Sequence, residues 1–222
     1  GFSNETAAQI EGRDCGNGVV IDHGDGWQTQ YCHMKRGSVT VRKGQRVGAG
    51  TVLGQVGFSG RTQFPHMHLS VCKDGAVVDP FDPDGQITCN LTDPDMLWQS
   101  APKYAPGGLL SAGFDLEVPS YDAVKDGQAN HQNLPRNAPA LVVWTYAFGA
   151  RAGDSLRLEI NGPAGPVFAK TVELSKPQAQ FFRAAGTRKP TRGFASGTYR
   201  GTVTLMRNGK IIDTIDTQTV LR

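Results

Sequence analysis

The chain has 222 residues, of which 38% are hydrophobic and 19% are charged, and it contains 28 glycines and 13 prolines. This length allows one large all-β domain or two modest ones, and the glycine and proline content is typical of a turn-rich β protein. The formal net charge of +3 is only mildly basic, so it does not indicate a nucleic-acid-binding protein.

The first hundred residues are expected to form a compact series of short strands. The predicted strands are, in chain order, residues 19–21, 27–33, 66–71 and 76–79. Gly24-Asp25-Gly26 predicts the turn between the first two strands. Between Val41 and Gly57, glycines alternate with single apolar residues, a pattern typical of tight turns between very short strands. These features predict one β domain over residues 1–100.

The composition shifts to Pro, Gly, Asp, Asn and Ser after residue 90. We predict a linker over residues 101–138, interrupted by a possible strand at residues 114–118. Past the linker, apolar and polar residues alternate, and Asn208-Gly209 is a strong hairpin signal. About seven strands are expected there, which predicts an immunoglobulin-like β-sandwich of unknown role over residues 139–222.

No segment has a long helical periodicity, so the predicted fold class is all-β with little helix. The longest apolar run covers residues 141–150 and is interrupted by Thr145. It is far too short to cross a bilayer, so we expect no transmembrane segment.

The four cysteines are Cys15, Cys32, Cys72 and Cys89, and no Cys-x-x-Cys spacing occurs, which argues against a thiolate zinc site or a redox motif. Each half of the set can close a short local loop, so we predict the disulfides Cys15–Cys32 and Cys72–Cys89. Such bonds indicate a periplasmic or secreted protein. The alternative is four reduced, buried thiols.

The strongest indication of chemistry is His66-Met67-His68 together with Tyr31-Cys32-His33. Successive side chains of a strand point to opposite faces, so His66 and His68 are expected to project from one side. Three imidazoles that converge are suited to a zinc hydrolase. The alternative for each is an ordinary histidine that hydrogen-bonds to its surroundings.

The motifs of residues 15–80 form an ordered series, which comprises the strand and turn of residues 18–27, Tyr31-x-His33-Met34, the Val/Gly pattern of residues 41–50, Gly57-x-Ser-Gly60 and Pro65-His66-x-His68. In this order and spacing they resemble the lysostaphin/LytM-type family of peptidoglycan zinc metalloendopeptidases. The resemblance implies a barrel-sandwich-like metallopeptidase domain with Zn²⁺ as cofactor and a cell-wall peptide as substrate. It does not cover the C-terminal half.

The resemblance also implies roles for the three histidines. His68 corresponds to a metal ligand, and His33 and His66 correspond to the catalytic pair beside the metal. The family's other two ligands come from a His-x-x-x-Asp segment, and no such segment occurs before His33. We therefore expect that this segment lies outside the sequence and that the zinc site in this chain is incomplete.

Three functions are compatible with these observations. The first is a zinc-dependent endopeptidase that hydrolyses peptide cross-bridges of bacterial peptidoglycan. The second is a catalytically degenerate binding or regulatory domain on the same scaffold. The third is a biotinyl or lipoyl carrier, which the Val/Gly pattern of residues 41–53 also resembles, but no lysine follows at the expected hairpin tip. The sequence does not predict the oligomeric state or the bond that is cut.

Overall fold

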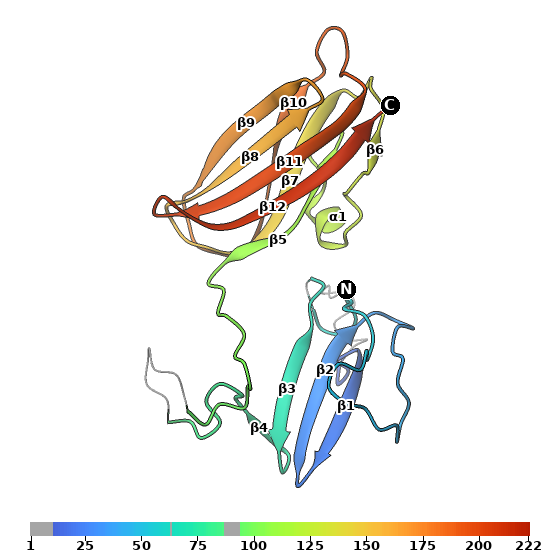
Figure 1. Cartoon of the computed structure of the whole chain (residues 1–222), viewed down its shortest axis with the longest axis vertical. Helices are drawn as coiled ribbons and strands as arrows, with labels where there is room; N and C mark the ends of the chain where they lie inside the picture. Colours follow the sequence, from blue (N-terminus) through green and yellow to red (C-terminus); the bar gives the residue numbers. More distant parts are fainter. Residues whose placement is uncertain (1–10, 63, 87–93) are drawn as a thin grey trace. The chain divides into compact units, whose positions relative to one another are not determined.

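The computed structural model describes residues 11–62, 64–86 and 94–222, and it divides into two compact units, Gly1–Lys103 and Tyr104–Arg222 (Figure 1). Strands dominate both units, and one five-residue helix is present among the described residues, which confirms the all-β prediction. The sheets in this part of the chain are open, and none closes into a barrel. The described residues contain no helix with the length and apolarity needed to cross a membrane.

The first unit contains one antiparallel sheet with the strand order β1-β2-β3-β4. Its strands are β1 (Asn17–Gly24), β2 (Trp27–Met34), β3 (His68–Lys73) and β4 (Ala76–Val78). Asp25 and Gly26 join β1 to β2 with φ angles of +48° and +78°. Asp74 and Gly75 join β3 to β4 in the same way, with φ angles of +51° and +83°. Asp-Gly pairs favour these two-residue turns, so the sequence specifies both hairpins locally.

The short strands predicted between Val41 and Gly57 are a correction. This stretch contains no strand in the structure and touches the sheet through the isolated bridges Met34↔Val56 and Gly57↔His66. Glycines supply turns there, but the backbone of the stretch finds few partners with which to form a ladder. The same bridge places His66 outside β3, which begins at His68 rather than at residue 66.

The second unit consists of a three-stranded sheet, β10-β7-β5, and a five-stranded sheet, β6-β12-β11-β8-β9. Its elements are β5 (Gly108–Asp115), α1 (Tyr121–Lys125), β6 (Asn133–Leu134), β7 (Ala140–Ala150), β8 (Asp154–Gly162), β9 (Gly165–Leu174), β10 (Gln178–Arg188), β11 (Gly197–Arg207) and β12 (Lys210–Leu221). One hydrophobic core receives side chains from both sheets, for example Val143 of β7 and Leu158 of β8. The predicted hairpin at Asn208-Gly209 joins β11 to β12.

The predicted linker over residues 101–138 differs from the structure. The second unit begins at Tyr104, and the stretch includes β5, α1 and β6. Phe114 of β5 is fully buried in the core, and β5 pairs with β7. The Pro- and Gly-rich composition concealed this strand, because its ladder partner lies about thirty residues further along the chain.

A buried ion pair joins β8 to β11 in the second unit. Arg207 donates from Nε and Nη2 to the two carboxylate oxygens of Asp154 at 2.9 and 2.8 Å, and the Asp154 side chain is 1% exposed. These hydrogen bonds hold the pKa of the Asp154 carboxyl below its usual value.

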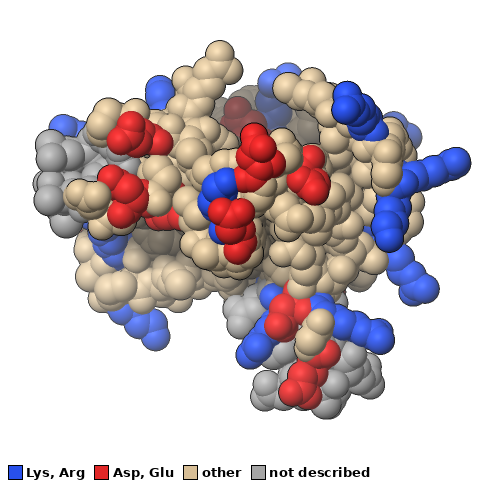
Figure 2. Space-filling model, turned by 90° about the horizontal axis from the view of Figure 1, so that it is seen from below, with Lys and Arg blue, Asp and Glu red and all other residues tan. Residues whose placement is uncertain are grey.

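On the face seen in Figure 2, acidic and basic side chains occur together, with several Lys and Arg side chains projecting from its right margin.

Candidate functional site

Three imidazole rings gather on the sheet of the first unit. His33 lies near the end of β2, His66 lies in the bridge to Gly57, and His68 begins β3. The ring centroid of His33 is 4.7 Å from that of His66 and 5.9 Å from that of His68. One ligand atom from each residue lies within 4.8 Å of the others. The predicted convergence of the three rings is therefore present in the structure.

Tertiary contacts fix the position of His33. Its φ angle of +63° is uncommon for a residue other than glycine. Its backbone N–H donates to the carbonyl of Cys15 at 2.8 Å, and Nδ1 lies 2.8 Å from the carbonyl oxygen of Ser59. A carbonyl oxygen only accepts, so Nδ1 carries the proton in this contact and Nε2 of the neutral ring is free to accept. One hydrogen bond thus fixes the backbone of His33 and the other fixes its ring.

The Cys15–Cys32 disulfide reinforces this arrangement. The bond is present as predicted, with a Cα–Cα distance of 4.7 Å, and Cys32 immediately precedes His33. Cys72 is half-buried and is not in a disulfide with another described residue. Cys89 lies outside the described residues, so the predicted Cys72–Cys89 disulfide stays a prediction.

Two side chains beside His66 determine the surroundings of its ring. Thr62 is 4% exposed, and its hydroxyl donates to the carbonyl oxygen of Phe64 at 2.8 Å. Nδ1 of His66 lies 3.0 Å from both that carbonyl oxygen and the Thr62 hydroxyl, so Nδ1 donates and Nε2 is left unprotonated in the neutral ring. The Phe64 ring stacks on His66 at 4.7 Å with an interplanar angle of 30°. The sequence signal that could have placed Phe64 at the site was its position two residues before His66.

The three histidines differ in exposure. His33 is 6% exposed, His66 is half-buried and His68 is exposed. Desolvation by burial, together with the charges of the other two imidazoles, lowers the pKa of His33 and outweighs the opposing hydrogen bond to Ser59. His33 is therefore held neutral at neutral pH. His68 Nε2 lies 3.2 Å from the Ser70 hydroxyl.

The other described histidines, and two polar side chains of the first unit, lie outside the three-histidine cluster. Tyr31 is half-buried, and His23 is exposed and hydrogen-bonds to Thr29. Arg61 faces solvent with 65% of its side chain exposed and lies 3.9 Å from a carboxylate oxygen of Asp14. His131 belongs to the second unit.

The cluster provides an imidazole ligand of the type that zinc binds. Of the three rings, His68 is the one that the resemblance assigns to the metal. One ligand atom from each of the three residues lies within 4.8 Å of the others, so the rings of His33 and His66 lie beside that ligand. No carboxylate of the described residues joins the three-histidine group.

Comparison with known proteins explains the order of these motifs. Residues 6–80 match the profile of Peptidase family M23. This segment belongs to that family. The match spans β1 to β4 and contains all three histidines, so the family assignment and the ring cluster concern the same part of the chain.

Three curated relatives each match part of this chain. Peptidoglycan DD-endopeptidase ShyA of Vibrio cholerae is 39% identical over 64 residues, which is 29% of this chain and 14% of ShyA. Peptidoglycan DD-endopeptidase ShyB of the same species is 34% identical over 77 residues, 35% of this chain and 18% of ShyB. Cell division protein DipM of Caulobacter vibrioides is 38% identical over 71 residues, 31% of this chain and 11% of DipM. The matched stretch thus spans less than a fifth of the length of each relative.

Solved structures give a weaker likeness. A β-glucuronidase from Bifidobacterium dentium aligns with 53% of this chain and 18% of its own chain, at 17% identity and a TM-score of 0.32. This TM-score supports no conclusion about fold or function.

Proposed function

We propose that this chain is part of a zinc-dependent endopeptidase that hydrolyses peptide cross-bridges of bacterial peptidoglycan. The observation that carries the proposal is the convergence of His33, His66 and His68 within an M23 segment. The matched relatives named as peptidoglycan DD-endopeptidases support this substrate class. The Cys15–Cys32 disulfide supports a periplasmic or secreted location.

Each histidine has a proposed role in this reaction. His68 is the metal ligand that the family resemblance assigns, and the exposed ring is accessible from solvent. His33 and His66 each direct a proton-bearing Nδ1 at a backbone carbonyl, which leaves Nε2 to take a proton from a water or a substrate group. The lowered pKa of His33 keeps that nitrogen unprotonated at neutral pH. Zinc, when bound, would lower the pKa of a coordinated water and polarise the scissile carbonyl.

Positioning is the second contribution of the chain. Burial of His33 and of Thr62 removes two of the groups around the cluster from bulk water. The backbone carbonyls of Ser59 and Phe64 fix the orientations of two rings without side-chain freedom. Fixed donors and acceptors need little reorganisation as charge develops, and electrostatic stabilisation is more effective in such a site.

The experiment uses the longer protein that contains this chain and the His-x-x-x-Asp segment expected outside it, stripped of metal with a chelator and then reloaded with zinc. Bound zinc is measured by elemental analysis, and release of soluble fragments from purified peptidoglycan is followed by mass spectrometry. Because general-base residues contribute about 10²–10⁴ in rate, His66→Ala should lower release by at least about 100-fold. His131→Ala is the matched control, since that histidine belongs to the second unit, and it should retain full activity.

A second function remains open because the described residues provide no carboxylate ligand beside the histidines. A degenerate binding or regulatory domain would bind peptidoglycan without cutting it. Sedimentation with peptidoglycan, no fragment release after zinc loading and no effect of His66→Ala would favour this function. Release that depends on zinc and on His66 would exclude it.

A further inference from the structure

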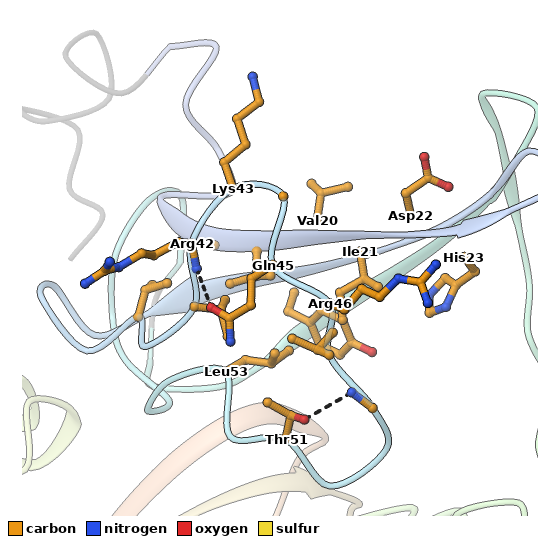
Figure 3. Close-up of a pocket in the computed structure, with 18 of the residues that line it drawn as sticks. Val20, Ile21, Asp22, His23, Arg42, Lys43, Gln45, Arg46, Thr51 and Leu53 are labelled. Atoms are coloured by element: carbon orange, nitrogen blue, oxygen red, sulfur yellow. Dashed lines mark hydrogen bonds between the residues drawn. The ribbon is translucent and has the colours of Figure 1, made fainter.

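A groove lies beside β1 in the first unit, on the part of the unit that does not contain the three histidines. It has a volume of about 1360 Å³ and lies between β1 and segment 39–53. Figure 3 shows Ile21 and Leu53 within it and Arg46 next to them, whereas Val20 and Asp22 point to the other side of the strand. The groove is built by the first unit alone.

The strand that borders the groove has a free edge. β1 pairs with β2 on one side and has no partner strand on the other among the described residues. An edge strand presents backbone N–H and C=O groups that are unpaired and ready to form a ladder with another strand. Segment 39–53 borders the groove and, among the described residues, forms no ladder with β1; its Thr40 N–H donates to the carbonyl of Leu53 within the segment at 3.0 Å.

The first unit also buries little apolar surface by itself. Its buried hydrophobic residues in the described ranges are Cys32, Met34 and Val71, whereas the continuous core cluster lies wholly in the second unit. Val39, which lines the groove, is 37% exposed. Apolar side chains exposed around a hollow of this kind mark a surface that binds another apolar element.

The charges at the groove indicate the chemistry of that element. Arg42, Lys43 and Arg46 are exposed on segment 39–53, and none of them forms an ion pair with a described carboxylate. In Figure 3, Arg42 and Lys43 extend outward from the segment while Arg46 lies along the groove. Three unpaired cations within five positions favour an acidic occupant.

We propose that the groove binds an extended acidic polypeptide strand from a partner, which adds to the free edge of β1. Its backbone would hydrogen-bond to β1, its apolar residues would pack on Ile21 and Leu53, and its carboxylates would pair with Arg42, Lys43 and Arg46. This is strand addition to an exposed sheet edge, in which main-chain bonds provide affinity and alternate side chains provide specificity. The inference does not depend on the proposed peptidase activity.

The probe is a blocked, fluorescently labelled heptapeptide of sequence EVDVTVE, and the control peptide has lysine at its three acidic positions. Seven extended residues span about 23 Å, close to the length of an eight-residue strand. Fluorescence anisotropy with the full chain should show binding of the acidic peptide only, weakening as salt is added. Amide hydrogen exchange in β1 should slow when the peptide is bound.

Variants separate the groove from general surface charge. Arg46→Glu should weaken binding about fivefold, because it removes one exposed ion pair and introduces a like charge. Lys176→Glu makes the same charge change in an exposed turn of the second unit and should leave binding unchanged. Equal weakening by both variants, or equal binding of both peptides, would overturn the proposal.

Two other occupants are outcomes of the same experiment, and each would overturn the proposal. If a second copy fills the groove, sedimentation equilibrium will show a dimer and β1 amides will be protected without peptide. If residues 1–10 fill it, removing them will expose the β1 amides to exchange and allow peptide binding that the full chain does not show.

Discussion

The disulfide next to the histidine cluster allows a quantitative test of how the site is held. Replacing Cys15 and Cys32 together by serine opens a link across 17 residues of sequence. The chain-entropy relation for a loop of this length gives about 3 kcal/mol of stabilisation at 25 °C. This is a large share of the stability expected of the first unit, because that unit contains few buried hydrophobic residues. We therefore predict that the double variant populates unfolded forms of the first unit readily.

Urea titration followed by hydrogen exchange and mass spectrometry can measure this effect on β2 separately from the second unit. With a slope of about 1 kcal/mol/M for a small unit, the unfolding midpoint of β2 should fall by about 3 M. The rate of peptidoglycan hydrolysis should fall as well, because the backbone N–H of His33 donates to the carbonyl of Cys15. Lys176→Ser, in an exposed turn of the second unit, is the control and should change neither quantity.

One result would refute this reasoning. If the double variant lost less than about 1 kcal/mol and hydrolysed peptidoglycan as fast as the parent protein, the disulfide would not position His33. The left-handed backbone of that residue would then be held by the contact with Ser59 alone.

Three further predictions concern single residues. Thr62→Val should slow peptidoglycan hydrolysis about tenfold, because it removes the hydroxyl that contacts Nδ1 of His66, and Thr62→Ser should retain the rate, as measured by release of soluble fragments. Gly60→Ala should destabilise the first unit far more than Gly85→Ala, as measured by thermal unfolding. Both glycines have positive φ, but a Cβ at Gly60 would lie 2.3 Å from a backbone atom, whereas a Cβ at Gly85 would meet nothing within 4 Å. The second unit should lose stability as pH falls below about 4, because the carboxyl of Asp154 has a lower pKa in the folded than in the unfolded protein. Asp154→Asn should remove this contribution to the pH dependence and lower the free energy of unfolding by about 3 kcal/mol. Unfolding measured across a pH series shows whether the slope disappears.

Local sequence signals predicted the elements that depend on few residues. The turns at Asp25-Gly26 and Asn208-Gly209 follow from the freedom of these residues to adopt positive φ, and both are present. The Cys15–Cys32 disulfide was predicted because its two cysteines flank a hairpin and are close in sequence. The rings of His66 and His68 do lie in one group with His33, but His66 reaches it from the bridge to Gly57 and not from a strand shared with His68.

The sequence-based prediction was wrong in two places where a strand depends on long-range pairing. β5 was hidden in a stretch with the composition of a linker, because its stability comes from β7 and from the core around Phe114. The stretch between Val41 and Gly57 has strand-like punctuation but no ladder, because few backbone partners reach it. Whether a segment forms a strand depends on the strand that pairs with it, and the local sequence pattern does not identify that partner.

The sequence by itself determined that this is an all-β chain and that its first unit carries an M23-type set of histidines. It also determined that a disulfide between Cys15 and Cys32 links two parts of that unit. Only the tertiary structure decided how the rings are oriented. The proton on His33 Nδ1 depends on a carbonyl 26 residues away at Ser59, and the orientation of His66 depends on the burial of Thr62. Hydrogen bonds to backbone carbonyls carry no residue signature, so their acceptors become known only when the fold brings them within reach.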